Sequence, residues 1–412
     1  MVLLRELLCS RTASFLGAIA YMITPFMITM AVYGHGSQLM TAAFIPWALW
    51  LSIRLWGKPS LTNAGFLALI LGFQLQRAHA QIAYYTWLLI GLYFLIMIIY
   101  SLIEKNEKLI ISKKLLFILM ACTLGIGISA LIYIPAIEYT PFSVRGGSSS
   151  GGSDYNYATG WSFHPYEILT FLIPSSFGFG GQIYWGYMPF TDYPNYMGII
   201  ILGLSLIGMV YKKGIFKWYL LSATILALFI SFGRHFSLVY NLFFNFFPYF
   251  DKFRVPHMIL ILVQFNVAIF AAFGIDKILQ SKNRSLPKWF YPSISPFVVF
   301  LLSLVFASNS IKRFLMERFT VPRTSEPSQI QAINSIRWDL WINDAWVMIL
   351  FIALFFSLTW MWYNNKISKK VFSSCLITLA LIDISIVDKK IIEPDRSCLL
   401  YTSPSPRDAT LS

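Results

Sequence analysis

Histidine is the side chain that most readily gains and loses a proton near neutral pH, and this sequence contains five histidines. They are His35 in GHGSQ, His79 in RAHAQ, His164 in WSFHPY, His235 in GRHF and His257 in FRVPH. In the topology derived below, all five fall on the outer face of a membrane. We therefore predict a shared polar cavity on that face. For any single histidine, the alternative is an interfacial side chain satisfied by headgroups and backbone.

The carboxylates lean toward the same face, where general acid–base chemistry would need them. The outer set is Glu138, Asp154, Glu167, Asp192, Asp251, Glu317, Glu326, Asp339 and Asp344. Asp192 in PFTDYPNYMG and Asp251 in PYFDKFR stand out because the rings and prolines around them would restrict solvent. We predict Asp251, Asp192 and His257 as catalytic candidates. A turn-forming aspartate is the alternative for each acid.

Two arginines, Arg234 and Arg254, lie at the outer ends of apolar runs. A guanidinium at headgroup depth can bind a phosphate through two parallel hydrogen bonds, so both are predicted substrate-binding residues for a polyprenyl phosphate. Snorkelling to lipid headgroups is the alternative. Residues 246–257, FFPYFDKFRVPH, hold Asp251, Arg254 and His257 together and are predicted to form the rim of the site, with Arg254 as phosphate anchor.

The composition is that of a membrane protein. Of 412 residues, 57% are hydrophobic and 12% are charged, whereas a soluble protein carries about 25% charged residues. Apolar runs near the length that crosses a bilayer recur throughout. We predict an all-α polytopic fold with eleven spans, at residues 12–33, 39–56, 60–76, 81–103, 115–137, 194–211, 216–233, 256–275, 289–308, 340–363 and 371–387. With the amino terminus inside, the lysine-rich stretches 105–114, 212–217, 277–288 and 366–370 are cytoplasmic, as the positive-inside rule requires.

We predict one transmembrane domain over residues 1–392 with long outer loops at 138–193 and 309–339. The first loop contains the linker-like GGSSSGGS, and residues 171–198 are predicted to be an irregular aromatic segment dipping into the interface. In the second loop, IKRFLMERF favours a solvated loop, with a basic amphipathic helix as the alternative. Residues 393–412 have the composition of foreign linker sequence, so we expect a truncated fragment and leave this polar tail out of the fold. The four cysteines lack zinc or disulfide spacing, no cofactor is evident, and no pattern supports a divalent metal.

Four segments carry a family resemblance: GHGSQLMTAAFIPWALW, RAHAQIAYY, YWGYMPFTDYPNYMG and LFFNFFPYFDKFRVPHMILILVQFNVAIFAAFGID. They resemble bacterial YfhO-type membrane proteins over roughly residues 12–276. That family is similar to the GT-C glycosyltransferases, which use polyprenyl-phosphate-linked sugars on the outer face of the cytoplasmic membrane. The resemblance implies these matched positions: His35, His79, Tyr196, Gly198, Arg254 and Pro256.

One departure concerns the catalytic acid. GT-C enzymes carry it in the first outer loop after the first span, and here that loop is GHGSQ, without an acid. Either an earlier span and its acidic loop precede Met1, or the catalytic role is carried differently.

The resemblance and the outer clustering of histidines, acids and arginines together favour a glycosyltransferase-like function. The predicted protein sits in the bacterial cytoplasmic membrane and transfers a sugar from a polyprenyl-phosphate donor to a cell-envelope acceptor. Its substrate-binding candidates are Arg254, Arg234, His35, His79 and Tyr196. The alternatives are a transporter or flippase of lipid-linked saccharide and a non-enzymatic envelope-assembly protein. We predict no nucleic-acid partner.

Overall fold

A computed structural model describes residues 1–104, 108–143, 153–281 and 286–392 of the chain. The described part is 78% helical and contains no strand, which confirms an all-α membrane protein. Residues 146–152 of the linker-like GGSSSGGS and the polar tail, residues 393–412, lie outside the described residues. The α-helices are α1 (Val2–Glu6), α2 (Arg11–Met22), α3 (Pro25–Val32), α4 (Gly36–Ala43), α5 (Ile45–Gly57), α6 (Leu61–Gln76), α7 (Ala80–Glu104), α8 (Lys108–Tyr139), α9 (Tyr155–Ala158), α10 (Ile199–Tyr211), α11 (Ile215–Ser231), α12 (Ser237–Phe246), α13 (Leu260–Leu279), α14 (Phe290–Phe306), α15 (Ser308–Arg318), α16 (Pro327–Tyr363) and α17 (Lys369–Ile392).

The structure has fewer membrane-length helices than the eleven predicted spans. In the described part, six helical segments are long and apolar enough to cross a bilayer, and up to nine if each bent helix pair counts as one span. The bent pairs are α2 with α3, α11 with α12, and α14 with α15. The two remaining predicted spans fall on α6 and α10, which have only 16 and 13 residues. Those lengths are below the ~20 residues that span the hydrocarbon layer, so the apolar runs overstate the number of full crossings.

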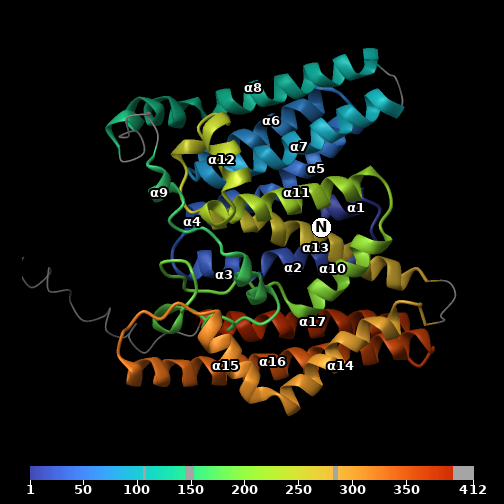
Figure 1. The fold of residues 1–412 in the computed structure, drawn as a ribbon. Coiled ribbons are helices and arrows are strands. Elements are labelled where there is room, and N and C mark those ends of the chain that lie inside the picture. Colours follow the sequence, from blue (N-terminus) through green and yellow to red (C-terminus); the bar gives the residue numbers. More distant parts are fainter. Residues whose placement is uncertain (105–107, 144–152, 282–285, 393–412) are drawn as a thin grey trace, which may run out of the picture.

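Helix α13 forms the centre of the bundle (Figure 1). In the segment Pro256–Leu279, 94% of the apolar window is buried inside the protein, compared with 17% for the segment Ile111–Phe142 that contains α8. Helices α2, α7, α10 and α11 pack directly on α13. An apolar helix enclosed on all sides by other helices is a core element, whereas α8 leaves most of its apolar surface for lipid.

Two of the three bends follow from local sequence. Pro25 begins α3, and a proline disfavours helical backbone at the residue before it, so α2 ends at Met22 and the pair bends by 45°. Gly233 has a left-handed backbone (φ +47°) between α11 and α12, where the chain turns by 112°. Helix α12 therefore runs across the end of the bundle instead of continuing the span.

The irregular segments gather at one end of the helices, on the left of Figure 1, together with α9 and α12. They include the 3₁₀ turns η2 (Pro165–Phe171), η3 (Gly181–Ile183), η4 (Gly233–Phe236), η5 (Phe250–Lys252) and η6 (Pro256–Ile259). Residues 171–198 contain no α-helix, as predicted, and many of them are buried. Residues 309–339 differ from the solvated loop that we favoured. The amphipathic alternative occurs as α15, and α16 already begins at Pro327 because its apolar residues continue toward its amino terminus.

Candidate functional site

A cavity of about 330 Å³ opens among the irregular segments at this end of the bundle. Four stretches of chain build it: Gly160, residues 186–189, residues 234–235 of η4, and the turn between α15 and α16. Its lining residues are Gly160, Gly186, Tyr187, Met188, Pro189, Arg234, His235, Val321 and Arg323. We call it the outer cavity. It brings together two arginines, a histidine and a tyrosine, which are groups that can bind or react with a polar ligand.

Arg234 is held at the rim by the backbone of α9 and the residues after it. Its Nε donates to the Thr159 carbonyl oxygen at 3.1 Å, and its Nη2 donates to the Gly160 carbonyl oxygen at 2.9 Å. Its backbone N–H donates to Ser162 Oγ at 3.0 Å. The preceding Gly233 is required here, because a Cβ on it would lie 2.0 Å from Ser162 Oγ. The guanidinium is thus fixed by carbonyl groups, which leaves its charge uncompensated.

Arg323 supplies a second cation from another part of the chain. Its Nη2 donates to the Met188 carbonyl oxygen at 2.7 Å, its Nη1 donates to that of Pro189, and its guanidinium lies 5.3 Å from the centre of the Tyr184 ring. Among the described residues, neither Arg234 nor Arg323 has a carboxylate within ion-pair distance. Two guanidinium groups without an acid partner favour an anionic ligand, above all a phosphate, whose oxygens match their forked geometry.

Two of the five histidines, which were predicted to share a polar cavity, lie in contact beside the outer cavity. His235 lines it, and the His164 ring lies 4.6 Å from the His235 ring and stacks at 3.7 Å on Tyr187. Burial lowers the pKa of His164, so this imidazole is neutral at pH 7. Burial also lowers the pKa of His235, to about 4, so both imidazoles are neutral and each has a ring nitrogen that can accept a hydrogen bond from a hydroxyl group.

A buried carboxyl group, Glu167, supports the cavity wall from behind. It is 1% exposed and accepts hydrogen bonds from the Tyr187 backbone N–H at 2.9 Å and from the Tyr184 hydroxyl at 3.0 and 3.1 Å. Burial raises the pKa of Glu167 to about 7, although those hydrogen bonds and Arg323 act in the opposite direction. The group therefore changes its charge within the physiological pH range.

Arg254, the predicted phosphate anchor, lies outside the outer cavity. Its guanidinium is held between the rings of Tyr157 and Trp161, 4.4 and 4.3 Å from their centres, and its Nη1 donates to the Tyr157 hydroxyl at 3.2 Å. Cation–π contacts on both faces stabilise the guanidinium where it is. Residues 157–161 thus separate Arg254 from Arg234, which contacts Thr159 and Gly160.

None of the three predicted catalytic residues lines this cavity. His257 is buried beside Tyr193, with its Nε2 at 3.3 Å from the Tyr193 hydroxyl, and its backbone N–H donates to the Trp161 carbonyl oxygen. Asp192 precedes Tyr193 and is exposed. Asp251 forms an ion pair with Lys252 at 3.1 Å. Their catalytic roles stay predictions.

The other predicted binding residues occupy helix ends. His35 is the residue before α4, and His79 Nδ1 accepts from the Ile82 backbone N–H at the start of α7. Tyr196 is buried, donates to Asp383 of α17 at 2.5 Å and accepts from the Ile199 N–H at the start of α10. Those hydrogen bonds link α10 to α17 and are typical of contacts that stabilise helix packing. None of the three lines the outer cavity.

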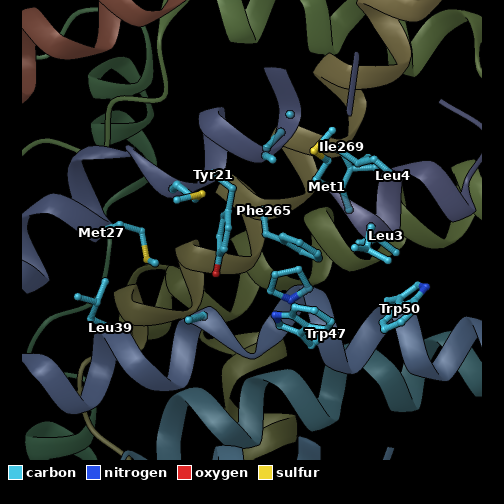
Figure 2. Close-up of a pocket in the computed structure, with 17 residues that line it drawn as sticks. Met1, Leu3, Leu4, Tyr21, Met27, Leu39, Trp47, Trp50, Phe265 and Ile269 are labelled. Carbon is cyan, nitrogen blue, oxygen red and sulfur yellow. The ribbon is translucent and has the colours of Figure 1, made fainter. Parts of the chain in front are cut away.

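A larger cavity, about 460 Å³, lies among α1, α2, α4, α5 and α13 (Figure 2). Tyr21, Phe265, Trp47 and Trp50 face it, and the Tyr21 hydroxyl is already bonded to the Ala42 carbonyl oxygen at 2.9 Å. Its lining side chains are almost wholly apolar and include no acidic or basic side chain. Such a cavity fits a hydrocarbon chain and lacks the side chains needed for acid–base catalysis or phosphate binding.

Within the described residues, no three His, Cys, Asp or Glu side chains come close enough to hold a metal ion. No family model, curated protein or solved structure matches the chain. The outer cavity must therefore be interpreted from its own geometry.

The sequence patterns do not point to Arg323, to Tyr187 or to the role of Glu167. Glu167 appeared only among the outer acids, and Arg323 only within a long loop. The sequence signal for them is weak, because Arg323 meets Met188 across 135 positions. The nearest clue was the aromatic, glycine-rich composition of residues 171–198, which indicated a folded segment.

Proposed function

We propose that this chain is a membrane glycosyltransferase-like protein that binds a polyprenyl-phosphate-linked sugar at the outer cavity. In this proposal the chain crosses a bacterial cytoplasmic membrane several times in a GT-C-like arrangement, with its amino terminus inside, and transfers the sugar to a cell-envelope acceptor. The observation that carries the proposal is the pair Arg234 and Arg323, two guanidinium groups on one cavity without an acid partner among the described residues.

The transfer would use the groups that line the cavity. The acceptor hydroxyl oxygen forms a bond to the anomeric carbon, and the bond from that carbon to the phosphate oxygen breaks. The electron pair leaves on the phosphate, where Arg234 and Arg323 stabilise the added negative charge. The acceptor proton goes to His235, which is neutral before the reaction. Tyr187 offers an aromatic face on which a sugar ring can stack.

The direct test is binding of polyprenyl phosphate to the purified protein in lipid nanodiscs. Arg323→Gln and Arg234→Gln are each expected to weaken binding by at least about tenfold, because a charge-assisted hydrogen bond contributes about 1.5–3 kcal/mol. Arg313→Gln is the matched control, since Arg313 is exposed on nearby α15 and lies outside the cavity. Equal binding by all four proteins would refute the phosphate role.

Movement of the same lipid across the bilayer is the alternative function, and one observation favours it. Arg337 of α16 is fully buried, with Nη1 3.2 Å from Asn334 Oδ1 and with Nε and Nη2 unpaired among the described residues. Buried cations within membrane helices are typical of transport pathways. Labelled donor in sealed vesicles separates the two functions: a glycosyltransferase moves label to an acceptor, whereas a flippase moves intact donor to the other leaflet.

A further inference from the structure

The wall of the outer cavity formed by residues 184–189 is a small folded unit of its own. Phe177, Tyr184 and Met188 form a separate hydrophobic cluster, apart from the main core. Gly186 makes the tight turn possible, because a Cβ there would lie 2.4 Å from the Tyr184 hydroxyl oxygen. Trp161, Tyr187 and Phe319 pack against this cluster, and hydrogen bonds add to these apolar contacts in holding the turn in place.

Several of these hydrogen bonds end on Glu167, and backbone hydrogen bonds from Trp185 N–H to the Phe177 carbonyl and from Val321 N–H to the Trp185 carbonyl also hold the turn. The Glu167 carboxyl group accepts from Tyr187 N–H and from the Tyr184 hydroxyl, and that hydroxyl in turn accepts from the Met188 N–H at 3.0 Å. Two of the residues so held, Tyr187 and Met188, line the cavity. The Met188 carbonyl also accepts from Arg323, so the placement of one cavity arginine depends on this wall.

We propose that Glu167 is a positioning residue that fixes the 184–189 wall of the outer cavity, and that gain or loss of one proton on its carboxyl group closes or opens that wall. The identity of the ligand rests on the proposed function, whereas the movement of the wall does not. The effect is a pH-dependent affinity for the anionic ligand, through the placement of Tyr187 and Arg323.

The direction of the pH effect on the wall follows from the burial of the Glu167 carboxyl group. With the wall closed, burial holds the pKa of Glu167 at about 7, and with the wall open the exposed carboxyl returns to about 4.3. The closed wall therefore holds the proton more tightly, is favoured at low pH, and loses stability as pH rises through 7. From about pH 6 to about pH 8 the ratio of closed to open wall falls about tenfold.

The surrounding groups do not supply this transition. The titratable and charged groups facing Glu167 or its two tyrosine partners are Tyr184, Tyr187, Tyr166, His164, His235 and Arg323. Burial raises the pKa of Tyr184 and lowers that of His164, which moves both away from neutrality. Arginine stays charged throughout.

Hydrogen–deuterium exchange of residues 184–189 in nanodiscs, with no ligand added, tests the movement. Wild type is expected to lose about tenfold protection from about pH 6 to about pH 8, measured relative to Glu167→Gln at each pH, which also cancels base-catalysed exchange. Glu138→Gln, which alters an exposed carboxylate, is expected to behave as wild type. The same pH profile in wild type and Glu167→Gln would overturn the proposal.

Infrared difference spectroscopy of the wild type gives a second readout that does not need the variant to fold. A buried protonated carboxyl band is expected to disappear as pH rises through 7, and its absence at about pH 6 would equally overturn the proposal. Binding of polyprenyl phosphate, measured over the same pH range, separates the two claims. A wall that moves without any binding refutes the proposed function alone, whereas binding without wall movement refutes the role of Glu167 alone.

Discussion

Tyr196 shows how a single polar side chain can stabilise helix packing at this end of the protein. Its hydroxyl joins Asp383 of α17 to the first N–H of α10, and a second oxygen of Asp383 accepts from the Ile200 N–H at 3.1 Å. The carboxylate thus serves as a cap from another helix for the amino-terminal end of α10, where unpaired N–H groups and the helix dipole favour negative charge.

Replacing this hydroxyl is expected to destabilise the protein. Tyr196→Phe leaves a buried N–H and a carboxylate oxygen without their partner, which costs about 1–3 kcal/mol. Thermal unfolding in detergent would measure the loss. Tyr291→Phe is the control, because Tyr291 is 65% exposed and its change should stay within about 0.5 kcal/mol. An unchanged unfolding midpoint for Tyr196→Phe would show that the hydrogen bonds of the Tyr196 hydroxyl do not stabilise the protein.

At the scale of elements, the closest packing occurs between α10 and α13. A Cβ on Gly208 would lie 1.9 Å from the Phe270 carbonyl oxygen, and a Cβ on Gly274 would lie 1.9 Å from that of Leu204. Small residues let membrane helices approach until their backbones touch. The short α10 is therefore fixed by backbone contact with the central helix.

Gly208→Ala is expected to force α10 and α13 apart. The overpacking costs about 1–3 kcal/mol, more than the helix propensity that alanine gains. Gly203→Ala on the same helix is the matched control, because a Cβ there meets nothing within 4 Å. It should be neutral or stabilising by up to about 1 kcal/mol. Unfolding midpoints of the two variants in detergent test the contrast, and identical values would contradict it.

The elements that could be predicted from sequence are those with long apolar runs. Each predicted span coincides with a helix, a bent pair or a short helix, because hydropathy reports which residues avoid water. Hydropathy does not show whether the helix formed by an apolar run is still long enough to cross the membrane after a bend, such as those at Pro25 and Gly233. The contacts of Glu167 and Arg323 could not be predicted either, since both depend on an irregular segment without periodicity.

At the scale of the whole molecule, the predicted orientation can be tested directly. In a variant without native cysteines, Glu326→Cys at the start of α16 is expected to react with a membrane-impermeant maleimide added to intact cells. Lys213→Cys, between α10 and α11, should react only after the membrane is opened. Both positions are exposed in the structure. Labelling of the two cysteines from the same side would refute the topology, and the reverse pattern would invert it.

The enclosure of α13 has a consequence for how the protein is made. Four helices that pack on it, α2, α7, α10 and α11, precede it in the chain and so leave the ribosome earlier. Until α13 arrives, the surfaces that will cover it face lipid or one another. The contacts around α13 can therefore form only after residue 279 has been synthesised, whereas contacts among the earlier helices, such as that between α6 and α8, do not depend on it.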